Sequence, residues 1–250
     1  MLLACVIMCS LATTVFAQDI KKADPISASD ILDSPKAVKL YTAKEISDID
    51  TLVMRADAGI DELQQRTGTK LNCGVIVPEK IKANTRYTTQ LLSVVEYNGE
   101  QYEEYCATVV TDYSNNSEYY WNDSEMSKEE KYNYRVTNRI YFSKNSDMTH
   151  VFYQRSMTVY ETIGPVTANP VALDVFNEVV LDIVTYPGEY PQETYHVTKT
   201  FSNISANTPY ILGSPYAGKI YSSVWTYLKT GATLRLNDGT KVECYCIYNP

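Results

Sequence analysis

Apolar and polar residues alternate with two different periods along this chain of 250 residues. Between residues 42 and 68, apolar side chains recur every three or four positions, which places them on one face of an α-helix. Thr42 and Glu45 have the spacing of a capping box at a helix start, and Gly68 follows the last turn as a stop signal. Gly59 opposes helix formation by only about 1 kcal/mol. The pattern predicts one amphipathic helix over 42–68.

After this segment the period falls to two, which is typical of half-buried β-strands. Two strand-like runs, Tyr87–Tyr97 and Glu100–Thr111, flank the dipeptide Asn98-Gly99. Asn-Gly tolerates the positive φ angles of a two-residue hairpin turn, so this is the clearest hairpin signal in the chain. A loop of this length would place Leu91 opposite Cys106.

Further strand-like runs, separated by turn residues, continue to the C-terminus. They are Tyr132–Phe142, Val151–Tyr160, Glu178–Tyr186, Thr194–Phe201, Lys219–Lys229, Thr233–Leu236 and Lys241–Tyr248. Such spacing predicts a mainly β fold of antiparallel β-sandwich architecture, preceded by one amphipathic helix. Gly164-Pro165 and Asn169-Pro170 interrupt the pattern. We therefore expect β domains at 69–163 and 168–250, with one continuous β-sandwich as the alternative.

The N-terminal segment is mostly apolar, carries no charged side chain and ends in Val15-Phe16-Ala17. Small residues at the last and third-last positions suit a signal peptidase, and the segment is shorter than the roughly 20 apolar residues that cross a bilayer. We expect a signal peptide over 1–17 and a secreted or cell-surface protein. The lack of a basic residue before Lys21 leaves a buried N-terminal strand as one alternative. The lipidation-like sequence Leu2-Leu3-Ala4-Cys5 leaves a lipoprotein as another.

Composition limits the partners. The formal net charge of −8 repels phosphate backbones and anionic membranes, so no nucleic-acid partner is expected. No apolar run after residue 17 is long enough to form a membrane span. Residues 18–41 are polar and lack a sustained period, which predicts a flexible lead before the helix.

Four cysteines remain after the expected signal peptide: Cys73, Cys106, Cys244 and Cys246. An even count in an exported chain favours disulfides. Cys244 and Cys246 lie two residues apart on one predicted strand, too far apart for an unstrained bond. Cys73 and Cys106 both lie in the N-terminal half of the chain, so we predict a Cys73–Cys106 disulfide, with four buried free thiols as the alternative. The Cys-x-Cys spacing lacks a second close pair or a nearby histidine, so no metal site is predicted.

Tyrosine is unusually abundant, with 22 Tyr against 5 Phe. Three adjacent aromatics, Tyr119, Tyr120 and Trp121, lie in the polar and acidic stretch 112–131, expected to be a loop between the hairpins. Aromatic side chains exposed on a loop can stack on a sugar ring or hold a peptide, so these three are the candidate ligand-binding residues. The alternative is that they cover the end of a sheet. The acidic residues of this stretch lack the ordered spacing of a calcium loop.

Catalytic signatures are missing from the sequence. His150 and His196 lie within or beside strand-like runs and are expected to be strand residues, and no motif for a nucleophile, a phosphate or a cofactor occurs. The sequence predicts an exported, non-enzymatic, β-rich binding or adhesion-type protein whose ligand is a glycan or another protein. One alternative is a structural subunit of a surface assembly, joined by strand addition at a sheet edge. Another is a secreted hydrolase that uses carboxylates.

Overall fold

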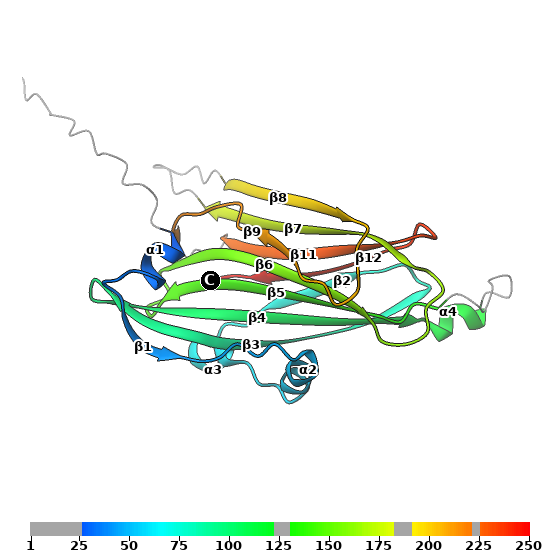
Figure 1. Cartoon of the computed structure of the whole chain (residues 1–250), viewed down its shortest axis with the longest axis horizontal. Coiled ribbons are helices and arrows are strands. Elements are labelled where there is room, and N and C mark those ends of the chain that lie inside the picture. Colours follow the sequence, from blue (N-terminus) through cyan, green and yellow to red (C-terminus); the bar gives the residue numbers. More distant parts are fainter. Residues whose placement is uncertain (1–26, 123–130, 183–191, 222–225) are drawn as a thin grey trace, which may run out of the picture.

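The computed structural model describes residues 27–122, 131–182, 192–221 and 226–250, without the side chains of 120–122 and 182. Strands dominate the described residues, their sheets are antiparallel, and a short helix precedes them, which confirms the predicted fold class. The two sheets lie face to face as layers (Figure 1). The signal peptide expected over 1–17 lies outside the described residues.

The larger sheet has seven strands in the order β1-β3-β4-β5-β6-β10, and β9 also pairs with β6. The strands of the larger sheet are β1 (Val38–Thr42), β3 (Ile81–Tyr97), β4 (Glu100–Asn115), β5 (Tyr134–Asn145), β6 (His150–Thr162), β9 (Tyr210–Gly213) and β10 (Ile220–Tyr221). Each of the two long hairpins expected from the sequence is present, as β3–β4 and β5–β6.

The β3–β4 turn forms at Asn98 and Gly99, whose φ angles are 53° and 83°. These positive angles are those that the Asn-Gly dipeptide was expected to adopt. The predicted register was wrong by one residue, because Leu91 lies opposite Tyr105 rather than Cys106. A β-bulge at Leu92 inserts one unpaired residue into β3. Strict alternation in the sequence could not show this insertion.

The smaller sheet has five strands in the order β2-β12-β11-β7-β8. The strands of the smaller sheet are β2 (Asn72–Ile76), β7 (Pro170–Asp182), β8 (Gln192–Ser202), β11 (Tyr227–Leu236) and β12 (Lys241–Tyr248). The β11–β12 hairpin turns at Gly239, with φ 85°. The two stretches expected as β domains exchange strands: β2 joins the smaller sheet, whereas β9 and β10 join the larger one.

Two hydrophobic clusters fill the space between the sheets, and both sheets contribute to each. In the first cluster, the Phe142 ring of the larger sheet stacks on Tyr248 of the smaller, with 4.6 Å between ring centroids. In the second, Tyr113 and Val136 of the larger sheet meet Leu234 of the smaller. Each large apolar side chain buried in this way contributes about 1.5–3 kcal/mol to stability. The inner face therefore holds the two layers together.

The described residues contain four helices, which are α1 (Ala28–Leu32), α2 (Ile49–Asp57), α3 (Glu62–Thr67) and α4 (Ser117–Asn122). The prediction of a flexible lead over 18–41 was wrong for its described part, because that part contains α1 and β1. Ser27 and Asp30 form a capping box at the start of α1. Ile31 then packs with Val95 and Phe152 on the outer face of the larger sheet.

The prediction of one helix over 42–68 was also wrong in detail. Thr42 ends β1, and the segment divides into α2 and α3 at Gly59, which has φ +67°. The N-caps are Asp48 and Asp61 rather than Thr42. Gly68 ends α3 in the left-handed conformation, as expected.

The α2–α3 pair covers the edge of β3 that β1 leaves unpaired. Arg55 and Glu62 form an ion pair at 2.6 Å. The Arg55 guanidinium also donates to the Thr89 carbonyl, and Glu62 accepts from the Leu91 backbone N–H. Arg55 and Glu62 thus form hydrogen bonds with main-chain groups of β3 that would otherwise be free to pair with another strand.

Candidate functional site

The aromatic residues expected to bind a ligand lie in a short helix. Tyr119, Tyr120 and Trp121 belong to α4, so the stretch 112–131 is not a loop throughout: β4 continues to Asn115 before α4 begins. Tyr119 is half-buried. The side chains of Tyr120 and Trp121 lie outside the described residues, so their role as a binding site stays a prediction.

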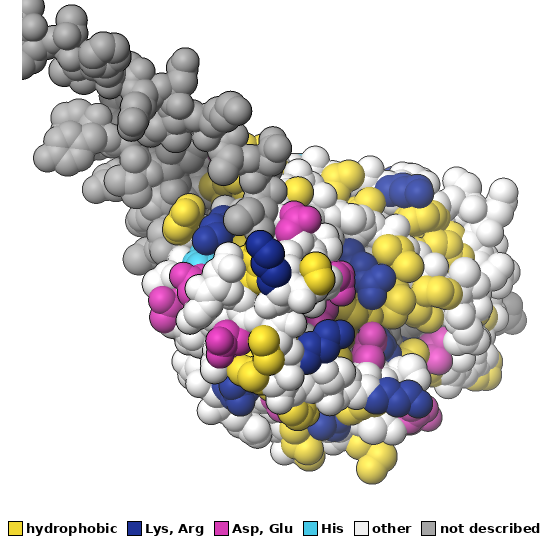
Figure 2. Space-filling view, turned by 60° about the vertical axis from the view of Figure 1, so that its left-hand side comes forward, with side chains coloured by type: hydrophobic (Ala, Val, Ile, Leu, Met, Phe, Trp, Pro, Cys, Tyr) yellow, Lys and Arg dark blue, Asp and Glu magenta, His cyan; other side chains and the backbone are white. Residues whose placement is uncertain are grey.

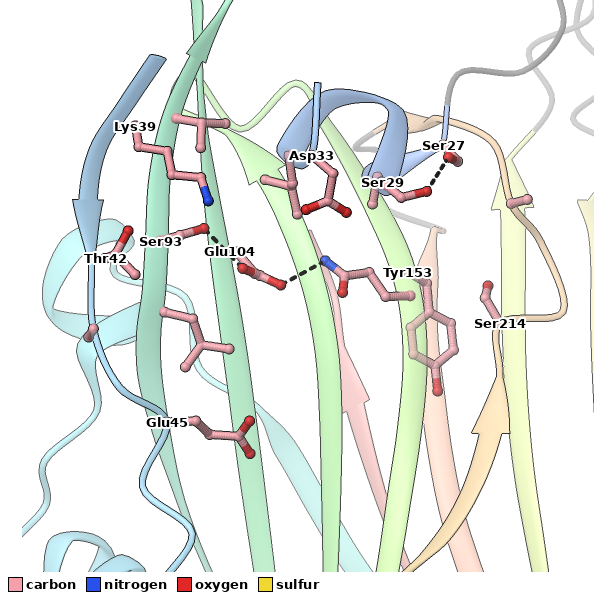
Figure 3. A pocket seen from close by; sticks show the side chains of 17 residues that line it. Ser27, Ser29, Asp33, Lys39, Thr42, Glu45, Ser93, Glu104, Tyr153 and Ser214 are labelled. Carbon is pink, nitrogen blue, oxygen red and sulfur yellow. Dashed lines mark hydrogen bonds between the residues drawn. The ribbon is translucent and has the colours of Figure 1, made fainter. Parts of the chain in front are cut away.

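A different site is formed on the outer face of the larger sheet, beside α1. There a cavity of about 540 Å³ is lined by three carboxylates, one lysine and several neutral polar groups (Figure 3). Its charged and polar lining residues are Ser27, Ser29, Asp33, Lys39, Thr42, Glu45, Ser93, Glu104, Tyr153, Gln154 and Ser214. Small-molecule sites commonly enclose roughly 300–1,000 Å³ and contain a few convergent polar groups. This cavity has both properties.

Three β-bulges surround the cavity. They insert Leu40 into β1, Leu92 into β3 and Gln154 into β6. The carbonyl of Leu92 accepts from the Ala43 N–H at 2.8 Å, and the carbonyl of Gln154 accepts from the Ser214 N–H at 3.0 Å. Ala43 and Ser214 both line the cavity, so these two bulges fasten its walls to the sheet. Bulges often re-aim side chains beside functional sites.

The bulge in β6 also changes which side chains face the cavity. Tyr153 packs between the sheets, whereas Gln154 bonds to Glu104 on the outer face. The Arg155 guanidinium lies 4.3 Å from the ring centroid of Tyr141. Tyr141 lies on the outer face with Arg139, so Gln154 and Arg155 share that face although they are consecutive. The unpaired residue thus presents an amide to the cavity.

Glu104 is the central carboxylate of the cavity. Ser93 Oγ donates to Glu104 Oε2 at 2.9 Å, and Gln154 Nε2 donates to Oε1 at 3.4 Å (Figure 3). Among the residues that the structure describes, no Lys or Arg nitrogen lies within 4.0 Å of Glu104. Lys39 and Asp33 point into the same space. Glu104 therefore has neutral donors and an open side toward the cavity.

Glu103, the preceding residue, faces the space between the sheets. Lys144 Nζ lies 2.7 Å from its carboxylate, Tyr105 donates to it at 2.8 Å, and Arg66 also binds it. Burial alone would raise the pKa of Glu103, but these donors hold it below its usual range. Consecutive strand residues point to opposite faces. The Glu103 side chain thus lies between the sheets, and the Glu104 side chain lies in the cavity.

The wall formed by residues 43–47 is fixed by the outer face of the larger sheet. Arg139 binds the Glu45 carboxylate at 2.6 Å and donates to the carbonyls of Ile46 and Ser47 at 3.0 and 3.1 Å. Tyr141 donates to Glu45 at 2.7 Å. Gln90 accepts from the Ile46 N–H at 3.0 Å. These contacts position Glu45, which was expected in a capping box, at the edge of the cavity.

The sequence interpretation missed Glu104 because it treated β4 as a plain half-buried strand. One signal was present, namely the adjacent pair Glu103-Glu104 directly before the mostly apolar run from Tyr105 to Val110. Two neighbouring strand carboxylates cannot both point to solvent if one face of the sheet is buried. At least one of them must therefore have a special environment.

The predicted Cys73–Cys106 disulfide is not formed in the structure, where all four described cysteines are free. Cys106 is buried on the outer face of β4, beside Thr108, whereas Cys73 packs against the first cluster between the sheets. The two thiols lie on opposite faces of the larger sheet, so a bond between them would require β4 to turn over. Strand positions, rather than the halves of the chain, decide the pairing.

The two histidines lie in strands, as expected, and neither lines the cavity. His150 begins β6 and is buried beside Tyr102 and Phe152. Burial lowers the pKa of His150. His196 lies exposed on β8, where its ring nitrogen bonds to Thr198 at 2.6 Å.

Comparison of the chain with protein-family models, curated proteins and solved structures gave no match. Within the described ranges, no three His, Cys, Asp or Glu side chains are grouped as a metal ion would require. In the same part of the chain, none of the helices has the length and apolarity of a membrane-crossing helix. The site is therefore interpreted from its own chemistry.

Proposed function

We propose that this protein is an exported binding protein that holds a small, polar, positively charged ligand in the cavity around Glu104. The observation that carries this proposal is a carboxylate with only neutral protein donors, aimed into a cavity that is large enough for a sugar or a short amine. A cationic ligand would complete its coordination with a charge-assisted hydrogen bond.

The charge of the lining supports a cation over an anion. Asp33, Glu45 and Glu104 line the cavity with Lys39 as their only basic counterpart among its lining residues. The formal net charge of −8 acts in the same direction. On the face seen in Figure 2, acidic and basic side chains are interspersed. We therefore propose that the carboxylates of the cavity attract the cation.

The sequence predicted a glycan or a protein as the ligand, and the cavity volume of about 540 Å³ favours the smaller of these. An amino sugar combines a polar ring, which neutral donors such as Ser93 and Gln154 suit, with an ammonium group for Glu104. Export remains an expectation from residues 1–17.

Titration calorimetry with three sugars of one ring size tests this proposal. Glucosamine carries a positive charge at slightly acidic pH, N-acetylglucosamine is neutral, and glucuronic acid is negative. We expect glucosamine to bind with measurable heat. The other two sugars should bind at least roughly tenfold more weakly than glucosamine, because one charge-assisted hydrogen bond contributes about 1.5–3 kcal/mol. Equal affinity for all three would refute the proposed role of charge.

A structural role in a surface assembly is the second candidate, and β1 favours it. β1 is an edge strand, and all five of its residues are exposed. Its large side chains Val38, Leu40 and Tyr41 are 57%, 50% and 46% exposed. Such an edge can accept a strand from another chain. Sedimentation at high concentration distinguishes the two, since a monomer that binds glucosamine excludes self-assembly as the main role.

The contacts at the cavity do not favour the carboxylate-dependent hydrolase. Glycoside hydrolysis needs two facing carboxyl groups, one of which donates a proton. Of the other two cavity carboxylates, Glu45 is held by Arg139 and Tyr141, which leaves Asp33 as the one carboxylate that could face Glu104. We therefore rank hydrolysis below ligand binding as the function of this cavity.

A separate experiment tests the predicted aromatic binding site at α4. Replacing Tyr119, Tyr120 and Trp121 together by Ala should abolish binding if these residues hold the ligand. If glucosamine binds the triple variant as it binds the unmodified protein, the cavity and not α4 is the site.

A further inference from the structure

Two cysteines that lie far apart in the sequence face each other across neighbouring strands. Cys73 of β2 lies directly opposite Cys246 of β12 in the antiparallel register. Both point between the sheets, where Cys246 belongs to the first cluster and Cys73 packs against it. Directly opposed residues have α-carbons about 4.5–5.5 Å apart, within the roughly 4.4–6.8 Å that a disulfide spans. The register therefore meets the main geometric requirement for a bond.

The other two described cysteines, Cys106 and Cys244, are not placed to compete for this bond. Cys244 faces the same side of β12 as Cys246, but it lies opposite Val75 and belongs to the second cluster. Cys106 lies on the outer face of the larger sheet, beside Thr108. Among the four cysteines that the structure describes, only Cys73 and Cys246 occupy directly opposed positions.

We propose that Cys73 and Cys246 form a cross-strand disulfide by exchange with a low-molecular-weight disulfide such as glutathione disulfide. The Cys73 thiolate attacks one sulfur of glutathione disulfide, which releases one glutathione and leaves a mixed disulfide on Cys73. The Cys246 thiolate then attacks the Cys73 sulfur and releases the second glutathione. The two cysteine sulfurs lose two electrons and two protons in total, and one glutathione disulfide is reduced to two glutathiones.

The order of these steps follows from burial. β2 is one of the two edge strands of the smaller sheet, and Cys73 is partly exposed there, so Cys73 can meet the oxidant first. Cys246 is 1% exposed. Burial and the neighbouring Cys73 raise the pKa of Cys246 well above its usual value, so its attack is the slower step. The pair would join the edge strand covalently to the strand that ends the chain.

Mass mapping of the full-length protein tests the proposal. The reduced protein is incubated with excess glutathione disulfide, alkylated, unfolded and digested without reduction. We expect one peptide that joins Cys73 to Cys246 with the loss of two hydrogens, and alkylated Cys106 and Cys244. The oxidised protein should also melt roughly 5–15 °C higher, because the bond closes a very long loop.

Two single variants provide the matched comparison. Cys73→Ser should abolish the joined peptide, whereas Cys244→Ser, at the neighbouring inward position of β12, should retain it. The proposal is overturned if Cys73 stops at the glutathione mixed disulfide while Cys246 remains a free thiol. It is equally overturned if Cys73 joins Cys106 or Cys244.

Discussion

Two adjacent glutamates on β4 experience opposite environments, one between the sheets and one in the cavity. Glu103 has an ammonium group at 2.7 Å, a tyrosine hydroxyl and a guanidinium as partners. Glu104 has a serine hydroxyl at 2.9 Å and an amide at 3.4 Å. The chain neutralises the first carboxylate itself and leaves the second with neutral donors only.

This difference separates a structural charge from a functional one. A buried ion pair whose partners come from the same chain contributes to a unique packing arrangement, and removing one member leaves the other uncompensated. A carboxylate without a cationic partner gains most when a ligand supplies one. We therefore expect replacement of Glu103 to reduce stability, and replacement of the adjacent Glu104 to reduce ligand binding.

The largest expected effect is at Glu103. Glu103→Ala leaves the Lys144 ammonium group without its carboxylate partner, and the Lys144 side chain is only 2% exposed. The free energy of unfolding should fall by about 3–5 kcal/mol, as measured by urea denaturation.

The control is Glu104→Ala, which removes the same group from the neighbouring position. It should cost less than about 1 kcal/mol, because its partners Ser93 and Gln154 are uncharged and the cavity can admit water. Equal losses in the two variants would erase the distinction between the two faces.

The next effect concerns the wall of the cavity. Arg139→Ala removes the group that holds Glu45, Ile46 and Ser47 against the larger sheet. Unfolding should become easier by about 2–3 kcal/mol, and glucosamine affinity should fall because the wall is released.

Arg155→Ala is the matched control for this change. Arg155 lies on the same face of the sheet, but its side chain is exposed and its guanidinium packs on the Tyr141 ring. Its loss should cost less than about 1 kcal/mol. If Arg155→Ala weakened glucosamine binding as much as Arg139→Ala, the wall would not be the relevant element.

A smaller effect comes from Asp238, a carboxylate that has both neutral and cationic partners. Tyr132 donates to it at 2.7 Å, Thr240 donates through its N–H and hydroxyl, and Lys80 lies at 3.4 Å. Although burial opposes the shift, these contacts lower its pKa from 3.8 to about 2. Because the folded state has the lower pKa, the stabilisation is present above about pH 4 and is lost as the pH falls toward 2.

Urea denaturation at several acidic pH values measures this dependence. In Asp238→Asn, stability should fall less between pH 4 and 2 than in the unmodified protein. Asp57→Asn, at an exposed carboxyl group, should keep the original slope. An unchanged slope in Asp238→Asn would show that other carboxyl groups cause the acid sensitivity.

The parts of the fold that depend on local residues were predictable. Asn98-Gly99 specified its turn, and Gly68 specified a helix end, because each acts through its own φ angle. The split between α2 and α3 was missed, since the apolar stripe continues past Gly59 and conceals the break. The capping box of Ser27 and Asp30 was missed, since the five residues of α1 are too few to show a helical period.

The candidate site could not be predicted because it depends on strands that are distant in sequence. Glu104 receives its two donors from β3 and β6, and a bulge delivers the second of them. Cys73 and Cys246 likewise become opposed only through the β2–β12 register. Alternation gives the face of a residue on its own strand, but it does not give the partner strand or the inserted residues.

The most direct test combines a change in the protein with a change in the ligand. Calorimetric titration of the unmodified protein and Glu104→Gln with glucosamine and N-acetylglucosamine measures how strongly the carboxylate and the ammonium group interact. We predict that Glu104→Gln unfolds at nearly the same urea concentration but binds glucosamine roughly ten- to a hundredfold more weakly, while its affinity for N-acetylglucosamine is unchanged. If Glu104→Gln bound glucosamine as tightly as the unmodified protein, Glu104 would not be the ligand's counter-ion.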